Sequence, residues 1–473
     1  MEIPWDTRPV ESHLVDTLAR RLTALACAAF GLSALLSIVT LHCLYADGSF
    51  QLTEVLKAGD FVAVAKNRDF ASFIFQFPVV MAIRLGVTNL HALQIAFGIG
   101  CFLPWPVVLL FCRALARRHF WLVMLGCAVG YLNSAFMPVG EYVIAHAFFW
   151  PALLAILFVR PLTPQAAAML AVSALVLVFS YESLLFLGPP LALLSAGRAF
   201  GKNEKFWARA VFACCSALLI LAAVIALDGI RHPQAPDNLG GFKQGLESMF
   251  LFPGWTIGWS FAWLTLLAAA CLDASGFTRK FFRPTLALLG AALLVWGLSP
   301  IINPNALNTE RQYADRSIQL LASLGLLLVA VTLRLCPKWF EARRNYLVGF
   351  SAALLLAQSV WQISATWQWR GFVGEWRRVL AAHHGPVSLG ETPFGGAAKN
   401  GQAVNFDWSW ANPNLSIMLA REGRVQSIIL SPGQTGWRPF NPLNPAELPK
   451  LRQYGVDYGD YIAALKKTGN SPR

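Results

Sequence analysis

Residues 22–50 read LTALACAAFGLSALLSIVTLHCLYADGSF, and this stretch decides the fold class. Residues 22–46 carry no Asp, Glu, Lys or Arg and exceed the roughly 20 apolar residues that a membrane-spanning helix needs. The apolar run stops at Asp47, where such a helix would meet the outer water layer. A carboxylate at this depth is costly and usually functional. The stretch therefore predicts a membrane span that delivers an acidic residue to the membrane surface.

The whole chain has the composition of a membrane protein. Of its 473 residues, 56% are hydrophobic and only 13% are charged, whereas soluble domains carry about 25% charged residues. We predict an all-α polytopic fold with eleven spans. The spans are expected at 22–46, 90–112, 120–138, 143–159, 164–180, 184–197, 207–227, 251–272, 285–302, 317–336 and 346–363.

The positions of the basic residues predict the orientation of these spans. Lys and Arg accumulate in cytoplasmic loops, and every strongly basic short loop falls on one side when eleven spans alternate. The N-terminus is then cytoplasmic, and the first span is a retained anchor rather than a cleaved signal peptide. This distribution accounts for much of the net charge of +13 without a nucleic-acid partner.

Two domains are expected on this topology. Residues 1–363 form the transmembrane domain, in which the outer loop 47–89 holds amphipathic helices lying on the membrane, one of them ended by Gly59 and a second interrupted at Pro78. Residues 364–473 form a small α/β domain outside the membrane. Its elements are expected as helices near 371–383, 413–421 and 445–454 and as strands near 386–389 and 425–430.

Asp47 is the leading candidate for a catalytic residue. A transferase that moves a sugar from a lipid phosphate to a hydroxyl group needs a carboxylate to accept the hydroxyl proton, and a lipid-linked donor keeps that chemistry at the interface. The alternative is that Asp47 only caps the helix that follows it, since Asp is a favoured N-cap residue.

Other outer residues are candidates for the same site. Arginine matches the geometry of phosphate, so Arg311 and Arg316, with Tyr313 between them, would hold the donor phosphate unless they pair with neighbouring acids. Carboxylates and aromatic rings at the outer helix ends and in the tail could line the cavity or contact the acceptor. These are Glu141, Glu182, Asp69, Trp408 and Trp410. Alternatively, Asp69 forms a surface pair with Arg68, and the two tryptophans pack against the membrane.

Missing motifs narrow the classes of function. The sequence contains no P-loop, no dinucleotide-binding glycine motif and no HExxH zinc motif, and its nine cysteines form no metal-binding CxxC pattern. No Asp-x-Asp pair occurs in the outer loops. A cofactor is therefore not expected, and a divalent metal finds no support.

Several short motifs together resemble the GT-C superfamily of membrane glycosyltransferases. They are Asp47-Gly48-Ser49-Phe50-Gln51-Leu52, Leu56-Lys57-Ala58-Gly59, Gln76-Phe77-Pro78 and Arg117-Arg118. The resemblance covers residues 1–200 by motif and the remainder by layout. The chain departs from it at Gly48, where many members carry a second acid, and at Phe77, where many carry a first proline.

The resemblance implies an inverting enzyme that uses a polyprenyl-phosphate-linked sugar donor. Its acceptor would be a glycan, lipid or protein hydroxyl on the outer side of the bacterial inner membrane, and Asp47 occupies the position of the catalytic acid in the family. Gly48 argues against a bound metal and leaves a catalytically silent relative open. Two further classes stay open: a flippase for a lipid-linked precursor, although no inverted halves are evident, and a non-catalytic scaffold in envelope assembly.

Overall fold

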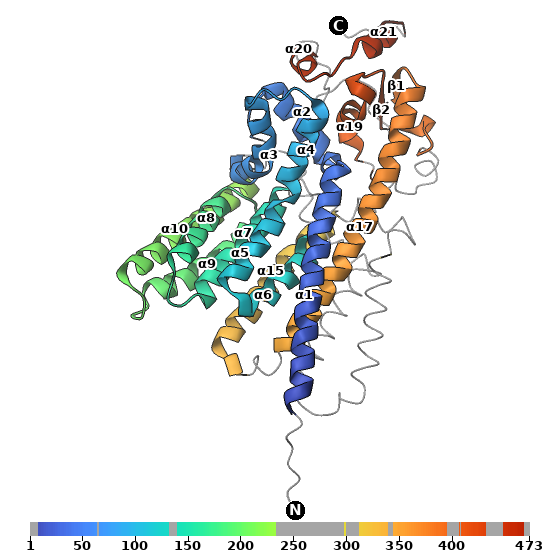
Figure 1. The fold of residues 1–473 in the computed structure, drawn as a ribbon. Helices are drawn as coiled ribbons and strands as arrows, with labels where there is room; N and C mark the ends of the chain where they lie inside the picture. Colours follow the sequence, from blue (N-terminus) through green and yellow to red (C-terminus); the bar gives the residue numbers. More distant parts are fainter. Residues whose placement is uncertain are drawn as a thin grey trace, which may run out of the picture.

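Two long helices form the axis of the molecule (Figure 1). The computed structural model describes residues 8–63, 66–131, 140–232, 298, 312–338, 344–394, 406, 408–431 and 448–467. Helix α1 (Arg8–Val39) and helix α17 (Arg344–Ala382) lie side by side and run in the same direction, so that the C-terminal elements sit at the end opposite the N-terminus. At 1.5 Å per residue, the 39 residues of α17 span about 58 Å, nearly twice the hydrocarbon thickness of a bilayer.

The helical membrane class is supported by five helices that are long and apolar enough to cross a bilayer within the described ranges. They are Thr17–Val39, Leu90–Leu115, Glu141–Phe158, Phe206–Arg231 and Leu347–Ala382. Three shorter apolar helices accompany them: Pro164–Val178, Leu184–Ala199 and Gln319–Leu335. Each of the eight coincides with a predicted span. The full set of eleven stays a prediction, since 251–272, all of 285–302 except residue 298, and residues 132–138 of the span 120–138 lie outside the described residues.

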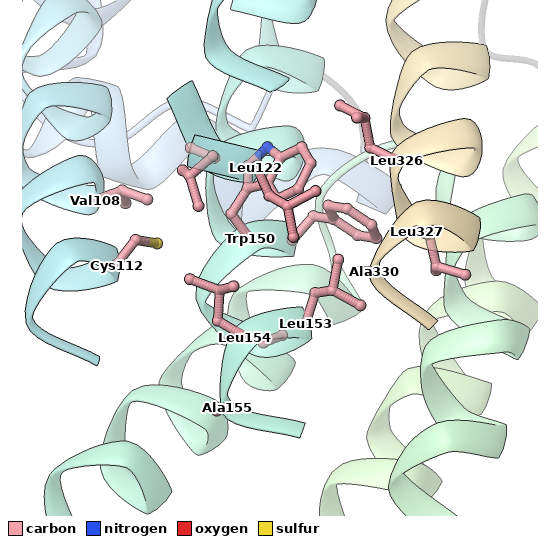
Figure 2. Close-up of a cluster of buried hydrophobic side chains, with 14 of the residues drawn as sticks. Val108, Cys112, Leu122, Trp150, Leu153, Leu154, Ala155, Leu326, Leu327 and Ala330 are labelled. Carbon is pink, nitrogen blue, oxygen red and sulfur yellow. The ribbon is translucent and has the colours of Figure 1, made fainter. Parts of the chain in front are cut away.

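The remaining apolar helices form a bundle to one side of α1 and α17. Their bounds are α4 (Leu90–Phe102), α5 (Pro104–Leu115), α6 (Phe120–Gly126) with a π-helical turn (Cys127–Tyr131), α7 (Glu141–Phe158), α8 (Pro164–Val178), α9 (Leu184–Ala199), α10 (Phe206–Arg231) and α15 (Gln312–Leu335). Figure 2 shows the core where α6, α7 and α15 meet, with Trp150 between Leu122 and Leu326. A Cβ on Gly126 would lie 1.9 Å from the Trp150 ring, so this contact requires glycine.

Three predicted boundaries are wrong. The first span ends at Val39 rather than at residue 46, because Leu41 adopts a left-handed conformation (φ 59°) that stops the helix. Pro78 does not interrupt its helix, since α3 (Asp69–Arg84) runs through it and the buried packing of its neighbours outweighs the one lost backbone hydrogen bond. The helix of the last span does not end at residue 363, because α17 continues to Ala382 and includes the helix predicted separately at 371–383.

Helix α2 (Asp47–Ala58) ends at Gly59 as predicted, with Gly59 at φ 69°. Its apolar face packs against other parts of the protein. Leu52, Val55 and Leu56 are fully buried in a cluster shared with the C-terminal elements. Helix α2 therefore packs between the helical bundle and the C-terminal part of the chain.

The C-terminal elements form a small α/β unit at the positions that the sequence predicts. Strand β1 (Gly385–Ser388) pairs in parallel with β2 (Ser427–Leu430), with Gly385 opposite Ser427. Helix α19 (Asn412–Leu419) lies between them in sequence, and α20 (Leu448–Arg452) and α21 (Gly459–Lys467) follow. The segment that enters α19 contacts α2, because Ser49 Oγ donates a hydrogen bond to the Ala411 carbonyl at 3.5 Å.

Candidate functional site

A strained turn presents Asp47. The turn between α1 and α2 contains a short 3-10 helix (His42–Leu44) and two residues with positive φ, Leu41 at 59° and Ala46 at 52°, and both of these residues are buried. Because neither residue is glycine, a positive φ strains the backbone at both positions. Such strain persists only where the surrounding structure enforces it, most often at functional sites. Asp47 follows directly as the first residue of α2 and is half-buried, at a helix end where a negative charge is favourable.

Helix α17 holds this turn through His42 and its neighbours. The imidazole Nδ1 is hydrogen-bonded to Thr366 Oγ1 at 3.3 Å, and the ring stacks on Trp369 at a centroid distance of 5.4 Å. Trp369 Nε1 donates a hydrogen bond to the Thr40 carbonyl at 3.1 Å. Complete burial lowers the pKa of His42 to about 3, so His42 is neutral at physiological pH.

Two aromatic residues of the C-terminal unit contact rings that precede and follow Asp47 in the sequence. Trp408 contacts Tyr45 edge to face at 6.4 Å, and Trp410 contacts Phe50 in the same way at 5.2 Å. The structure thus brings Trp408 and Trp410 to the turn that carries Asp47, although they lie more than 350 positions from it in sequence. Their proposed role in acceptor binding stays a prediction.

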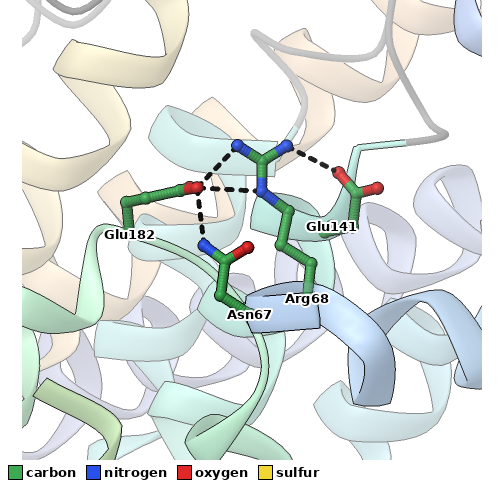
Figure 3. Close-up of polar contacts among 4 residues, drawn as sticks. All are labelled: Asn67, Arg68, Glu141 and Glu182. Atoms are coloured by element: carbon green, nitrogen blue, oxygen red, sulfur yellow. Dashed lines mark hydrogen bonds and ion pairs between the residues drawn. The ribbon is translucent and has the colours of Figure 1, made fainter. Parts of the chain in front are cut away.

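A second polar cluster joins the 3-10 helix Lys66–Arg68, the start of α7 and the connection between α8 and α9 (Figure 3). Oε1 of Glu182 accepts hydrogen bonds from Arg68 Nε at 3.0 Å, Arg68 Nη2 at 2.7 Å and Asn67 Nδ2 at 2.9 Å. On the other side of the guanidinium group, Glu141 Oε2 lies 3.5 Å from Arg68 Nη1. Glu141 and Glu182 therefore share one cation, and their placement in a substrate cavity stays a prediction.

Burial and charge act in opposite directions in this cluster. Burial alone would raise the pKa of Glu182, but the charge of Arg68 and the hydrogen bonds from Arg68 and Asn67 outweigh it and hold the pKa below its usual value. Burial alone would lower the pKa of Arg68, and the two glutamates raise it instead. Glu182 and Arg68 are thus both charged at neutral pH.

The arrangement corrects the sequence interpretation of Arg68. The competing interpretation of Asp69, a surface pair with Arg68, is wrong, because Arg68 points inward to Glu182 and Glu141. The Arg68 guanidinium also lies 4.8 Å from the centre of the Tyr181 ring. Asp69 begins α3, where the amide of Phe70 donates to the Phe179 carbonyl at 3.1 Å. The sequence offered no local signal for this cluster, because Glu182 lies 114 residues beyond Arg68.

The predicted phosphate-binding residues lie at the edge of what the structure describes. Arg311 lies outside the described residues, and Tyr313 and Arg316 belong to the first turns of α15 but their side chains are not described. Within the described ranges, no group of three His, Cys, Asp or Glu residues is placed to hold a metal ion.

An apolar pocket of about 430 Å³ lies between α3, the junction of α4 and α5, and α8. Ile74 and Pro78 of α3, Leu103 and Pro104 of the junction, and Val172 of α8 are among the residues that line it. Its volume is within the range of small-molecule sites, and its lining suits a hydrocarbon chain.

In comparisons with protein-family models, curated protein sequences and solved structures, no match to this chain was found.

Proposed function

We propose that this protein is an inverting, metal-independent glycosyltransferase of the GT-C type. It would transfer a sugar from a polyprenyl-phosphate donor to an acceptor hydroxyl on the outer side of the bacterial inner membrane. The observation that carries the proposal is the half-buried Asp47, which stands on a strained turn next to the end of a membrane helix, between two tryptophan contacts from the C-terminal unit.

The reaction assigns one role to each group. Asp47 accepts the proton of the acceptor hydroxyl, whose oxygen attacks the anomeric carbon while the bond from that carbon to the phosphate oxygen breaks. The electron pair of that bond leaves with the polyprenyl phosphate, for which Arg311 and Arg316 are the proposed cationic partners. Trp408 and Trp410 offer ring faces to the sugar, and attack from the side opposite the phosphate inverts the configuration.

Two further observations support a lipid-linked donor on the outer side. Helices α1 and α17 run in the same direction, as the first and last spans must when the number of spans is odd. The N-terminus and the C-terminal unit then face opposite sides of the membrane. The apolar pocket beside α3 offers room for part of a prenyl chain at the level of the spans.

The test is turnover by the full chain in proteoliposomes. A panel of synthetic polyprenyl-phosphate-linked hexoses and pentoses is supplied with a mixture of hydroxyl acceptors, and released polyprenyl phosphate is measured by mass spectrometry. D47N should lower the release by about 10²–10⁴-fold, the range for losing a general base. D60N is the matched control, because Asp60 lies in the same loop but forms an exposed ion pair with Arg84 at 2.8 Å.

Two results would contradict the proposal. One is release by D47N at the rate of the unmodified protein. The other is a folded, reconstituted protein that releases no polyprenyl phosphate from any donor of the panel, which would favour a flippase or a scaffold.

A further inference from the structure

The exposed face of α17 shows where this helix leaves the bilayer. From Arg344 to Trp367 the helix contains 24 residues, or about 35 Å, close to the roughly 30 Å of the hydrocarbon layer. The indole of Trp367 is 65% exposed, although Trp361, Trp369 and Trp376 of the same helix are buried. An outward-facing tryptophan at the end of a span is typical of the membrane–water interface.

Helix α1 places the interface at the same level. Its span ends at Val39, which is 53% exposed, and Thr40 is hydrogen-bonded through its carbonyl to Trp369, two residues beyond Trp367. Ser37 and Thr366 are in contact one turn lower, with their hydroxyl oxygens 3.2 Å apart. Two adjacent helices therefore change from apolar to polar surroundings at one height.

Beyond Trp367 the same face of α17 becomes basic. Arg370, Arg377 and Arg378 are all exposed, and their spacing of seven and eight residues keeps them on one side of the helix. The Arg370 guanidinium lies 5.6 Å from the centre of the Trp367 ring. Arg378 is paired with Glu375, whereas no carboxylate lies within 4 Å of Arg370 or Arg377 in the part of the chain that the structure describes.

We propose that the Trp367–Arg370 face of α17 binds the phosphate of anionic phospholipids in the outer leaflet. Arg370 rises about 4.5 Å above Trp367, within the headgroup layer, which is about 5–7 Å thick on each side. Its planar fork of donors matches a phosphate group, and the adjacent indole fixes the depth of the contact. Arg377 lies about 15 Å above Trp367 and acts only through its screened charge, since the Debye length is about 8–10 Å.

This site is independent of the proposed transfer reaction. It anchors the point at which α17 emerges from the membrane and so fixes the height of the C-terminal unit above the lipid. A lipid surface is favoured over a soluble acidic partner because the arginine that contacts the exposed tryptophan lies at headgroup depth.

The experiment is a titration of phosphatidylglycerol or phosphatidylcholine into the detergent-solubilised full chain, followed by native mass spectrometry. Phosphatidylglycerol should bind in preference to phosphatidylcholine, and R370Q should weaken it about fivefold, the effect of one basic residue near an anionic surface. R377Q should have a smaller effect. The double variant E375Q/R378Q is the matched control and should leave binding unchanged, because it removes the Glu375–Arg378 ion pair without changing the net charge.

A photoactivatable phosphatidylglycerol locates the contact and should crosslink to the peptide that contains Trp367 and Arg370. Equal affinity of R370Q and the unmodified protein, equal binding of the two phospholipids, or crosslinks confined to other helices would each overturn the proposal. So would binding of a polyprenyl phosphate at this face without binding of phosphatidylglycerol. None of these results depends on sugar transfer, so failure here is distinct from failure of the proposed function.

Discussion

Removing the charge of Arg68 should destabilise the protein through the carboxylates it leaves behind. In R68M, Glu182 loses two of the three hydrogen bonds to its Oε1 and the adjacent positive charge, and Glu141 loses its cation. Breaking a buried ion pair from one side costs about 3–5 kcal/mol. The side chain of Glu182 keeps 20% of its exposure and can recover some hydration, so we expect a loss of about 3 kcal/mol.

The assay is thermal unfolding in detergent, followed by the fluorescence of the seventeen tryptophans, none of which R68M alters. One kcal/mol shifts the midpoint by about 2–4 °C in a domain of 150–250 residues and by less in a longer chain, so R68M should unfold about 3–6 °C lower. The triple variant R68M/E141Q/E182Q is the matched control. It removes both carboxylate charges together with the cation and should recover most of the loss.

The pH dependence provides a second check. The pKa of Glu182 is lowered in the folded protein, so its contribution to stability is complete above the unfolded value of 4.5 and disappears as the pH falls toward the folded value. R68M should therefore differ most from the unmodified protein near neutral pH and least at strongly acidic pH. An unchanged midpoint for R68M, or a triple variant as unstable as R68M alone, would refute the role of buried charge.

The remaining predictions concern the turn, the packing of α4 and the continuity of α17. The pKa of His42 is about 3 in the folded protein and 6.5 in the unfolded chain, so His42 alone should lower the stability by about 2 kcal/mol between pH 6.5 and pH 5. In the same unfolding assay, H42F should lose this part of the pH dependence, whereas H232N, at an exposed histidine, should keep it. G100A should not fold, or should unfold at a far lower temperature than the unmodified protein, because its Cβ would lie 1.8 Å from the Phe75 carbonyl oxygen. G98A should unfold at the normal temperature, because its Cβ would meet only contacts of 3.4 Å or more. Equal unfolding midpoints for G100A and G98A would contradict this packing. G371P should break α17 above the membrane and reduce sugar transfer. G371A is the control: no atom lies within 4 Å of its Cβ, so it should unfold at the same temperature as the unmodified protein or slightly higher. Full activity of G371P would show that the continuity of the helix is unimportant.

The sequence was sufficient where local chemistry determines the structure. Gly59 ends α2 because only a left-handed residue fits there, and the short strands 386–389 and 425–430 were placed within two residues of β1 and β2. Eight predicted spans coincide with apolar helices because hydropathy alone marks such segments, and five of these helices have the length and hydropathy that a bilayer requires.

The sequence was insufficient where distant contacts determine the structure. No glycine, proline or charge marks the end of α1 at Val39, and the left-handed Leu41 is enforced by the burial of His42 and Tyr45 against α17. The prediction ended the last helix at residue 363 because the residues beyond it are more polar. The buried face of α17 nevertheless continues at helical spacing in Trp369, Phe372 and Trp376. Arg68 was misread because its partners come from other loops.

One helix positions both halves of the proposed site. Helix α17 holds the Asp47 turn through Thr366 and Trp369, and about two turns later Trp376 Nε1 donates to Ser416 Oγ of α19 at 3.3 Å. The same hydroxyl accepts the amide of Ile429 at 3.1 Å, which ties α19 to strand β2. The separation between Asp47 and the tryptophans that precede α19 is therefore set along a single rigid element, rather than by the loops on either side. In the proposed reaction, the distance between the base and the sugar-binding tryptophans must stay constant during turnover. A helix supports this better than a loop of the same length, because a helix stretches far less.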